Sequence, residues 1–345
     1  MDNTKYFPAV EDIQKASGVL EEILEPTPLQ KNPNLSDVYD AQVYLKREDL
    51  QMVRSYKIRG AYNKIRSIAP GVLKYGIVCA SAGNHAQGVA FSCNKLHIMG
   101  SIYMPVTTPR QKIEQVRMFG KEYIDIVLVG DTFDAANAAA IEYAKKSGKT
   151  FIPPFDDQKI IEGQGTIGYE ILSQAKVAPD YVFVPIGGGG LASGVGAYIK
   201  TLSPKTKVIG VEPAGAPCMK VAIEKGEVIE LDQINKFVDG AAVKKAGKLT
   251  YEICKDVLDD IITVPEGAVC TSIIKLYNKS AIVVEPAGAL SIAALKFYSE
   301  EIKGKNVVCI VSGSNNDITR MEEIREKSLI YEGLKHYFIV NFPQK

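Results

Sequence analysis

The 345-residue sequence predicts an α/β fold in which two open parallel sheets face a cleft. Short apolar runs alternate with helical patterns through both halves of the chain, which is typical of βαβ units and parallel sheets. The length corresponds to roughly two domains of about 150 residues each. Ligands of open parallel sheets bind outside the carboxyl ends of the strands. We therefore expect the functional residues at the turns that connect strands to helices.

The first 50 residues carry a weak pattern. A helix is expected over 10–22, followed by a proline cluster at 26–28 that ends it, then loops and a short strand over 42–45. From residue 57 the alternation is clear. Strands are predicted over 77–80, 101–104 and 124–129, with helices over 85–96, 110–119 and 131–146. Thr108-Pro109-Arg110-Gln111 matches a capping box with proline at the first helical position.

The second half repeats this pattern. Strands are predicted over 181–185, 207–211, 261–264 and 306–311, and a last helix over 318–331 with Asp317 as its cap. We expect a larger domain from 1–50 and 155–331, a smaller domain from 51–154, and a separate segment over 332–345.

Composition excludes several classes of protein. Hydrophobic residues make up 46% of the chain and the formal net charge is +1, so neither a nucleic-acid partner nor a membrane span is expected. The first five residues show no apolar signal core, and no leader is expected. The six cysteines show no C-x-x-C pairing, which predicts reduced core thiols of a cytoplasmic protein and no metal site. They are Cys79, Cys93, Cys218, Cys254, Cys270 and Cys309.

Lys57 is the first candidate functional residue. It lies in the first turn of an amphipathic helix that begins behind Ser55, a favourable N-cap residue. The helix N-terminus and the nearby Arg59 both disfavour a further positive charge, which predicts a lowered pKa for Lys57. A neutral amine can form a Schiff base with an aldehyde. A lone lysine is more often a solvated surface residue, so this hypothesis depends on other stretches.

Two turns have the character of anion sites. Ser81-Ala82-Gly83-Asn84-His85 joins a strand to a helix, and its backbone N–H groups suit a carboxylate, with the Asn84 amide free for a second ligand group. Gly187, Gly188, Gly189 and Gly190, followed by Leu191, suit a phosphate. The first stretch alone would be an ordinary βα turn, and the glycine run also fits the loose G-x-G-x-x-A dinucleotide pattern.

Two further polar residues follow apolar runs. Ser312 ends the strand over 306–311, where its hydroxyl could meet a heterocyclic nitrogen, although a polar turn alone would explain it. Glu285 is either a carboxylate that faces the cleft or a charge satisfied at the start of a helix. Residue pattern alone leaves these alternatives open.

An activated lysine, a carboxylate site, a phosphate loop and a serine at a strand end together suit pyridoxal phosphate acting on an amino acid. The chain resembles the threonine dehydratases (threonine ammonia-lyases), which have the tryptophan-synthase-like fold type II. The resemblance covers nearly the whole chain. It is carried by Ser-Tyr-Lys-Ile-Arg-Gly-Ala at 55–61, Ser-Ala-Gly-Asn-His-Ala-Gln-Gly at 81–88 and Gly-Gly-Gly-Gly-Leu at 187–191.

The resemblance implies a role for each matching residue. Lys57 would be the Schiff-base lysine and proton carrier, with Tyr56 packed beside the cofactor, which lies in the cleft between the two sheets. Asn84 would bond the ring hydroxyl, residues 187–191 the phosphate, and Ser312 the pyridine nitrogen. The substrate would meet Ser81, Ala82, Gly83 and His85.

The implied reaction converts L-threonine to 2-oxobutanoate and ammonia, the first step towards isoleucine, and L-serine to pyruvate. The implied assembly is a homo-oligomer, either a dimer or a tetramer. Two alternatives stay open: a serine racemase-like isomerase, which is disfavoured because Ala82 stands where that family has serine, and a non-catalytic nucleotide-binding module. The divalent site of the racemase family is not expected, because Cys218 replaces its acid beside Glu212 and Ala216.

The segment over 336–343 resembles the opening strand of the regulatory domain of biosynthetic threonine dehydratases, with a strand expected over 337–340. Only 17 residues follow Ser328 (345 − 328), fewer than the roughly 40 at which a domain begins to hold its own core. We therefore expect a remnant of that domain, which would lie on the catalytic core or on a partner subunit, or be disordered. We also expect no feedback inhibition by isoleucine.

Overall fold

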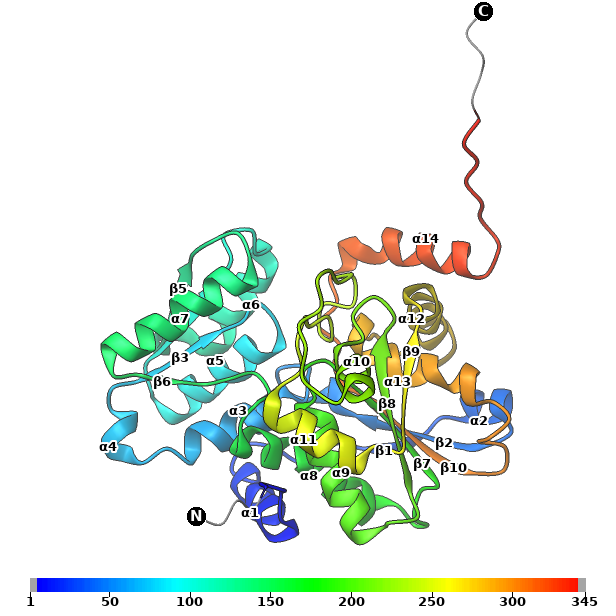
Figure 1. The fold of residues 1–345 in the computed structure, drawn as a ribbon, viewed down its shortest axis with the longest axis horizontal. Helices are drawn as coiled ribbons and strands as arrows, with labels where there is room; N and C mark the ends of the chain where they lie inside the picture. Colours follow the sequence, from blue (N-terminus) through cyan, green and yellow to red (C-terminus); the bar gives the residue numbers. More distant parts are fainter. Residues whose placement is uncertain (1–4, 341–345) are drawn as a thin grey trace, which may run out of the picture.

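The computed structural model describes residues 5–340, which contain two separate β-sheets with helices on both faces (Figure 1). The larger sheet has six strands in the order β1-β2-β10-β7-β8-β9. All its neighbouring strands run parallel except β1 and β2, which are antiparallel. The strands are β1 (Leu29–Lys31), β2 (Gln42–Arg47), β7 (Tyr181–Pro185), β8 (Lys207–Pro213), β9 (Asp260–Val264) and β10 (Asn306–Val311).

The smaller sheet has four parallel strands in the order β5-β4-β3-β6. They are β3 (Ile77–Ala80), β4 (Gly100–Met104), β5 (Ile124–Leu128) and β6 (Thr150–Phe151). The predicted strands of both sheets are confirmed, with ends that differ by at most two residues. Parallel strands were recognisable because both of their faces are buried, which gives continuous apolar runs.

The helices cover both faces of each sheet. They are α1 (Val10–Leu20), α2 (Pro33–Tyr39), α3 (Lys57–Arg66), α4 (Pro70–Leu73), α5 (Asn84–Leu96), α6 (Arg110–Gly120), α7 (Phe133–Ser147), α8 (Gln158–Gln174), α9 (Gly190–Leu202), α10 (Cys218–Lys225), α11 (Lys248–Val257), α12 (Glu266–Ser280), α13 (Pro286–Ala293) and α14 (Met321–Tyr331). Short 3₁₀ turns are η1 (Glu48–Leu50), η2 (Lys121–Tyr123), η3 (Ala294–Tyr298) and η4 (Ile318–Arg320). None of the helices between residues 5 and 340 is long and apolar enough to cross a membrane.

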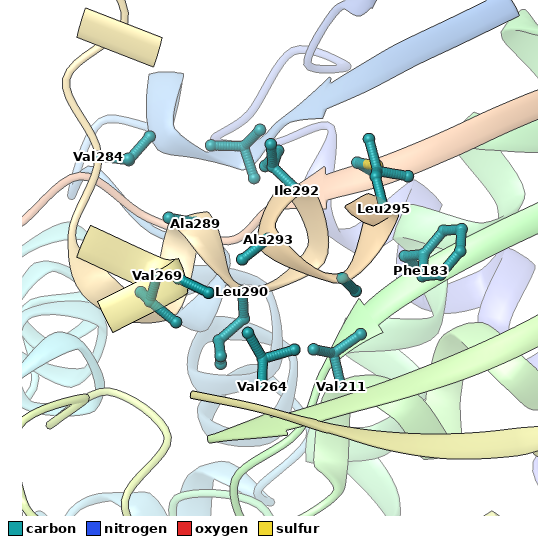
Figure 2. Close-up of a cluster of buried hydrophobic side chains, with 14 of the residues drawn as sticks. Phe183, Val211, Val264, Val269, Val284, Ala289, Leu290, Ile292, Ala293 and Leu295 are labelled. Atoms are coloured by element: carbon teal, nitrogen blue, oxygen red, sulfur yellow. The ribbon is translucent and has the colours of Figure 1, made fainter. Parts of the chain in front are cut away.

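Each sheet is packed between two apolar layers. On the larger sheet, α12 and α13 bury one face, where Leu290 of α13 lies near Val211 and Val264 (Figure 2). Helices α8, α9 and α11 bury the other face. On the smaller sheet, α3, α5 and α6 cover one face and α7 the other. All six cysteines are buried and free, in agreement with the prediction.

Helix α8 packs against a helix of each sheet, α3 and α9, through close backbone contacts. A Cβ built on Gly60 of α3 would lie 2.8 Å from the Ile160 carbonyl oxygen, and one on Gly194 of α9 would lie 2.3 Å from that of Ile161. Only glycine permits such approaches. Because α3 carries Lys57 and α9 follows the glycine run, α8 fixes the position of one relative to the other. The division of the chain at residues 50, 154 and 331 stays a prediction.

Several local predictions are wrong. Residues 29–39, expected as loops, form β1 and α2. The hydroxyls of Ser55 and Thr108 cap no helix; both are buried without a hydrogen-bond partner among the described residues. In each case the N-cap position is one residue later, at Tyr56 or Pro109, and the hydroxyl bonds none of the free N–H groups. Asp317 does cap η4, through the backbone N–H of Thr319 at 2.9 Å.

The predicted strand over 337–340 is also not observed. Residues 335–340 carry no regular structure and run outward from α14 (Figure 1), with Phe338 and Ile339 almost fully exposed. A strand requires a hydrogen-bonded neighbour, and no described strand lies beside this segment. The part of this prediction over 341–343 lies outside the described residues.

Candidate active site

Lys57 begins α3 and reaches toward the segment that follows β6. Its Nζ donates a hydrogen bond to the Pro154 carbonyl oxygen at 2.7 Å and lies 5.4 Å from the centre of the Tyr56 ring. Burial lowers the pKa of Lys57 to about 8, and the charge of Glu285 opposes this shift. The direction agrees with the sequence prediction but the cause differs. Burial dominates, and the Arg59 guanidinium is neutralised by two carboxylates of its own.

The glycine run follows β7 and leads into α9. Gly189 has φ of +96°, in the left-handed region, and is the residue that precedes the helix. A Cβ on Gly188 would lie 2.3 Å from a ring carbon of Phe155. No side chain of the described residues caps α9, so its first N–H groups are available to an anion. A turn of this geometry can bind a phosphate.

Pro154 and Phe155 connect the two parts of the site. The carbonyl of Pro154 accepts from Lys57, and the ring of the next residue, Phe155, packs on Gly188. Thr250 holds the far side of the loop through a 2.6 Å hydrogen bond to the Gly188 carbonyl. The lysine and the glycine run, about 130 positions apart in the sequence, are therefore separated in space by two consecutive residues.

Asn84, Glu285 and Asn315 form a hydrogen-bonded chain. Asn84 donates through Nδ2 to Glu285 Oε1 at 2.6 Å and accepts through Oδ1 from Asn315 Nδ2 at 2.7 Å. Burial raises the pKa of Glu285 to about 7, with the charge of Asp239 acting in the same direction. The sequence left Glu285 open between two roles. Its carboxylate accepts from Asn84 and, among the described residues, caps no helix, so the role at the helix start is not observed.

Ser312 and His85 lie next to this hydrogen-bonded chain of side chains. Ser312 is buried at the end of β10, and its carbonyl accepts from the backbone N–H of Tyr56 at 3.2 Å. His85 donates from Nε2 to the Ile152 carbonyl oxygen at 3.0 Å. Burial and then the charge of Lys57 lower the pKa of His85 to about 3, so its imidazole is neutral near pH 7. A neutral ring whose Nε2 proton is already donated is a structural residue rather than an acid.

The turn that precedes α5 carries the remaining candidates. Ser81, Ala82 and Gly83 are half-buried, and the backbone N–H of Gly83 donates to Ser81 Oγ at 3.2 Å. Gly88, one turn into α5, packs on Lys57 so closely that a Cβ there would lie 3.1 Å from the lysine carbonyl. The turn is thereby placed beside Lys57.

Glu212 and Cys218 also lie close to the glycine run. The two carboxylate oxygens of Glu212 accept the backbone N–H groups of Met219 and Lys220, each at 2.8 Å. Cys218 Sγ donates to the Gly187 carbonyl at 3.5 Å. Within residues 5–340, no three acidic, histidine or cysteine side chains gather as metal ligands would. The carboxylate of Glu212 bonds the first N–H groups of α10 (Cys218–Lys225).

The pH dependence of Lys57 reactivity is a direct test of this electrostatic arrangement. Neutral amine exists above the pKa, so a pKa of about 8 makes the apo protein's Lys57 reactive far below the pH at which an exposed lysine reacts. Glu285→Gln removes the charge that stabilises the ammonium, so the reactivity midpoint should shift to lower pH. Trinitrophenylation of Lys57, followed by peptide mass spectrometry across pH, measures that midpoint.

Glu212→Gln is the matched control. It removes a second buried carboxyl whose pKa burial also raises to about 7, but one whose oxygens face α10. This variant should keep the wild-type midpoint. A Glu285→Gln midpoint that is unchanged or higher would contradict the assigned contact.

Comparison with known proteins agrees with this geometry. Residues 20–313 match the model of the family described as "Pyridoxal-phosphate dependent enzyme". The chain is 61% identical to L-threonine dehydratase biosynthetic IlvA of Halalkalibacterium halodurans and 57% identical to that of Bacillus subtilis, each over 336 residues. These alignments cover 97% of this chain and 81% and 80% of the respective relatives.

Solved structures show the same fold. The processed form of threonine deaminase isoform 2 from Solanum lycopersicum superposes with a TM-score of 0.89 at 40% identity, covering 93% of this chain and 87% of that one. Maize serine racemase gives 0.86 at 28% identity, covering 95% of this chain and 100% of that one. On the extent of the family match and of these alignments, the chain belongs to the pyridoxal-phosphate dependent enzymes.

Proposed function

We propose that this protein is a threonine ammonia-lyase, which removes water from L-threonine with pyridoxal phosphate and yields 2-oxobutanoate and ammonia, a first step towards isoleucine. One observation carries the proposal. Lys57, a buried amine with a lowered pKa, lies close to the glycine run, because Pro154 bonds the lysine and Phe155 packs on Gly188. The names of the relatives at 57–61% identity support the choice of substrate.

The residues present fit this cofactor. At Gly188 and Gly189 a Cβ would collide with Phe155 or Thr250, so the loop presents backbone alone, as a phosphate requires. Residues 187–191 would hold the phosphate, Lys57 the aldehyde carbon, Asn84 the ring hydroxyl and Ser312 the ring nitrogen, with Tyr56 beside the ring. When bound, pyridoxal phosphate supplies an aldehyde and a conjugated ring that accepts an electron pair.

The chain's own groups can accept the proton from the substrate Cα and orient the substrate. Lys57 Nζ, neutral above about pH 8, can accept the proton from the substrate Cα, and its bond to Pro154 keeps it in place. The N–H groups of the turn at 81–84 would hold the substrate carboxylate, beside the neutral His85. Ser312 would offer a neutral hydroxyl to the ring nitrogen.

The proposal extends to L-serine, which lacks one methyl group; such a difference changes binding by only about 1–3 kcal/mol. A homo-oligomer, dimer or tetramer, and a cytoplasmic location complete the proposal. The location is supported by the six buried, reduced cysteines. Ketoacid release from L-threonine, L-serine and their D-forms by the purified holoenzyme tests the function. Absence of 2-oxobutanoate from L-threonine would refute it.

Ala82 is the residue that we expect to favour elimination over racemisation. Its methyl group offers no proton to the substrate face opposite Lys57, so wild-type enzyme given L-serine should release pyruvate with almost no D-serine. Ala82→Ser should raise the D-serine fraction, whereas Ala69→Ser, an added hydroxyl at an exposed position, should not. Chiral chromatography of the unreacted serine measures both. Comparable yields of D-serine and pyruvate from the wild type would favour the racemase alternative.

A further inference from the structure

Four charged side chains are buried together near the first turn of α3, the helix that begins with Lys57. We call Lys46, Glu48, Arg59 and Glu170 the buried tetrad; they come from β2, η1, α3 and α8, and each is at most 6% exposed. The tetrad contains two cations and two carboxylates, so its formal charge is zero. None of its members belongs to the cofactor or substrate contacts proposed above.

Arg59 is the centre of the tetrad, and all five of its N–H groups are bonded. Nε and Nη2 donate to the two oxygens of Glu48, both at 2.8 Å. Nη1 and Nη2 donate to the two oxygens of Glu170 at 2.6 and 3.0 Å, and Nη1 also donates to Thr166 Oγ1 at 3.0 Å. Two bidentate pairs on one planar guanidinium define its position and orientation, which a lysine could not reproduce.

The two carboxylates of the tetrad accept further hydrogen bonds. Glu48 accepts from Thr27 Oγ1 and from Gln51 Nε2 at 3.0 Å. Glu170 accepts from Lys46, which in turn donates to the Thr27 carbonyl at 2.6 Å. Such a cluster is a weak source of stability, because removing its charges from water offsets most of their attraction. Its fixed geometry is the property that distinguishes it from an apolar core.

That geometry acts on the first turn of α3. Arg59 lies two residues after Lys57, and a Cβ on Gly163 of α8 would come within 2.7 Å of the Arg59 carbonyl oxygen. Gly88 packs on the Lys57 carbonyl from the other side. The backbone of the turn is therefore confined by α5 and α8. The Arg59 side chain bonds it to Glu48 of η1 and to Glu170 of α8, and Glu170 in turn bonds Lys46 of β2.

We propose that Arg59 is the positioning residue for Lys57: the buried tetrad anchors the first turn of α3 to the larger sheet and so fixes the direction in which the lysine side chain enters the site. The inference rests on the proposed function, since it concerns the lysine that would hold the cofactor. A misplacement of about 1 Å in a reacting group can lower a rate by about 10²-fold.

Arg59→Ala in the full holoenzyme tests the proposal. We expect kcat for L-threonine to fall by about 10²-fold with KM changed much less. The absorbance band of the bound cofactor should shift, and less Lys57 should be found joined to cofactor after borohydride reduction and mass spectrometry. The last two readouts do not depend on turnover.

Chemical rescue separates positioning from general destabilisation. A cavity of about 190 Å³, lined by Arg59 and Glu170 together with Leu20 and Tyr169, lies beside the tetrad. Millimolar methylguanidinium can enter the space left in Arg59→Ala and bridge the two carboxylates, but it is not tethered to α3. It should therefore restore the thermal stability of Arg59→Ala while kcat and the cofactor band stay altered.

Arg47→Ala is the matched control. Arg47 also forms a buried bidentate pair, with Asp49, at 2.9 and 2.7 Å, but among the described residues it has no bond to α3. It should lose stability yet keep the kcat and the cofactor band of the wild type. Arg59→Lys, which retains the charge, covers the case in which Arg59→Ala does not fold; it should fold and still show a lowered kcat.

Three results would overturn the inference. They are a kcat in Arg59→Ala no lower than in Arg47→Ala, recovery of both kcat and band by methylguanidinium in step with stability, and a wild-type kcat in Arg59→Lys. A wild-type chain that does not attach the cofactor at Lys57 would instead refute the proposed function.

Discussion

Replacing Lys57 by alanine is expected to abolish 2-oxobutanoate formation and leave the fold intact. Its Nζ is the group placed both to hold the cofactor and to accept the substrate proton. The loss to stability is small, because the side chain contributes one hydrogen bond, to the Pro154 carbonyl, worth about 1 kcal/mol. Ketoacid release and circular dichroism of the purified variant measure activity and fold.

Lys64→Ala on the same helix is the control. Lys64 forms an ion pair with Asp157 at 2.6 Å that is partly exposed to solvent, so its loss costs about 1 kcal/mol or less. This variant should keep full turnover. Turnover by Lys57→Ala on the order of one hundredth of the wild-type rate would count against Lys57 as the covalent and proton-transfer group.

Gly189→Ala should weaken pyridoxal phosphate binding by about 10- to 100-fold, which corresponds to about 1.4–2.8 kcal/mol. At φ of +96° an L-residue is strained, and the added Cβ would lie 2.9 Å from Thr250 Cβ and 2.5 Å from the end of Met219. The loop must shift to relieve both, which moves the N–H groups at the start of α9 away from the phosphate. Spectroscopic titration of the apo protein with pyridoxal phosphate gives the Kd.

Gly226→Ala separates backbone strain from the effect on the site. Gly226 ends α10 at φ of +78°, and a Cβ there would meet no atom within 4 Å. The two variants therefore share a strain of about 1–2 kcal/mol, and both should unfold at a lower temperature. If Gly226→Ala weakened cofactor binding as much as Gly189→Ala, the phosphate role of the loop would be wrong.

Short-range signals in the sequence succeeded where local structure determines the outcome. Strands β3, β7 and β10 begin and end at the predicted residues, since a strand buried on both faces must be apolar along its whole length. Short-range signals failed at Ser55 and Thr108, where each hydroxyl was expected to cap a helix. The direction in which the chain enters these helices is imposed by the surrounding packing, and both hydroxyls are buried instead.

The lysine illustrates the same division. Its place at the start of a helix could be predicted from the periodicity of the apolar residues behind it. The cause of its lowered pKa could not, because the burial of Lys57 and the charge of Glu285 depend on residues far away in the sequence, such as Pro154 and Glu285 itself. Arg59, expected to repel the lysine charge, is neutralised by Glu48 and Glu170.

The sequence by itself determined the α/β class, most of the strands and helices, and the turns at which chemistry could occur. The tertiary structure alone decided which of these turns meet: Asn84 reaches Glu285 across 201 positions, and Arg59 reaches Glu170 across 111. Helix and strand patterns depend on residues that are close in the sequence, whereas strand order and helix packing bring distant residues together. The chemistry of the site depends on those distant contacts, and so does the position of its lysine.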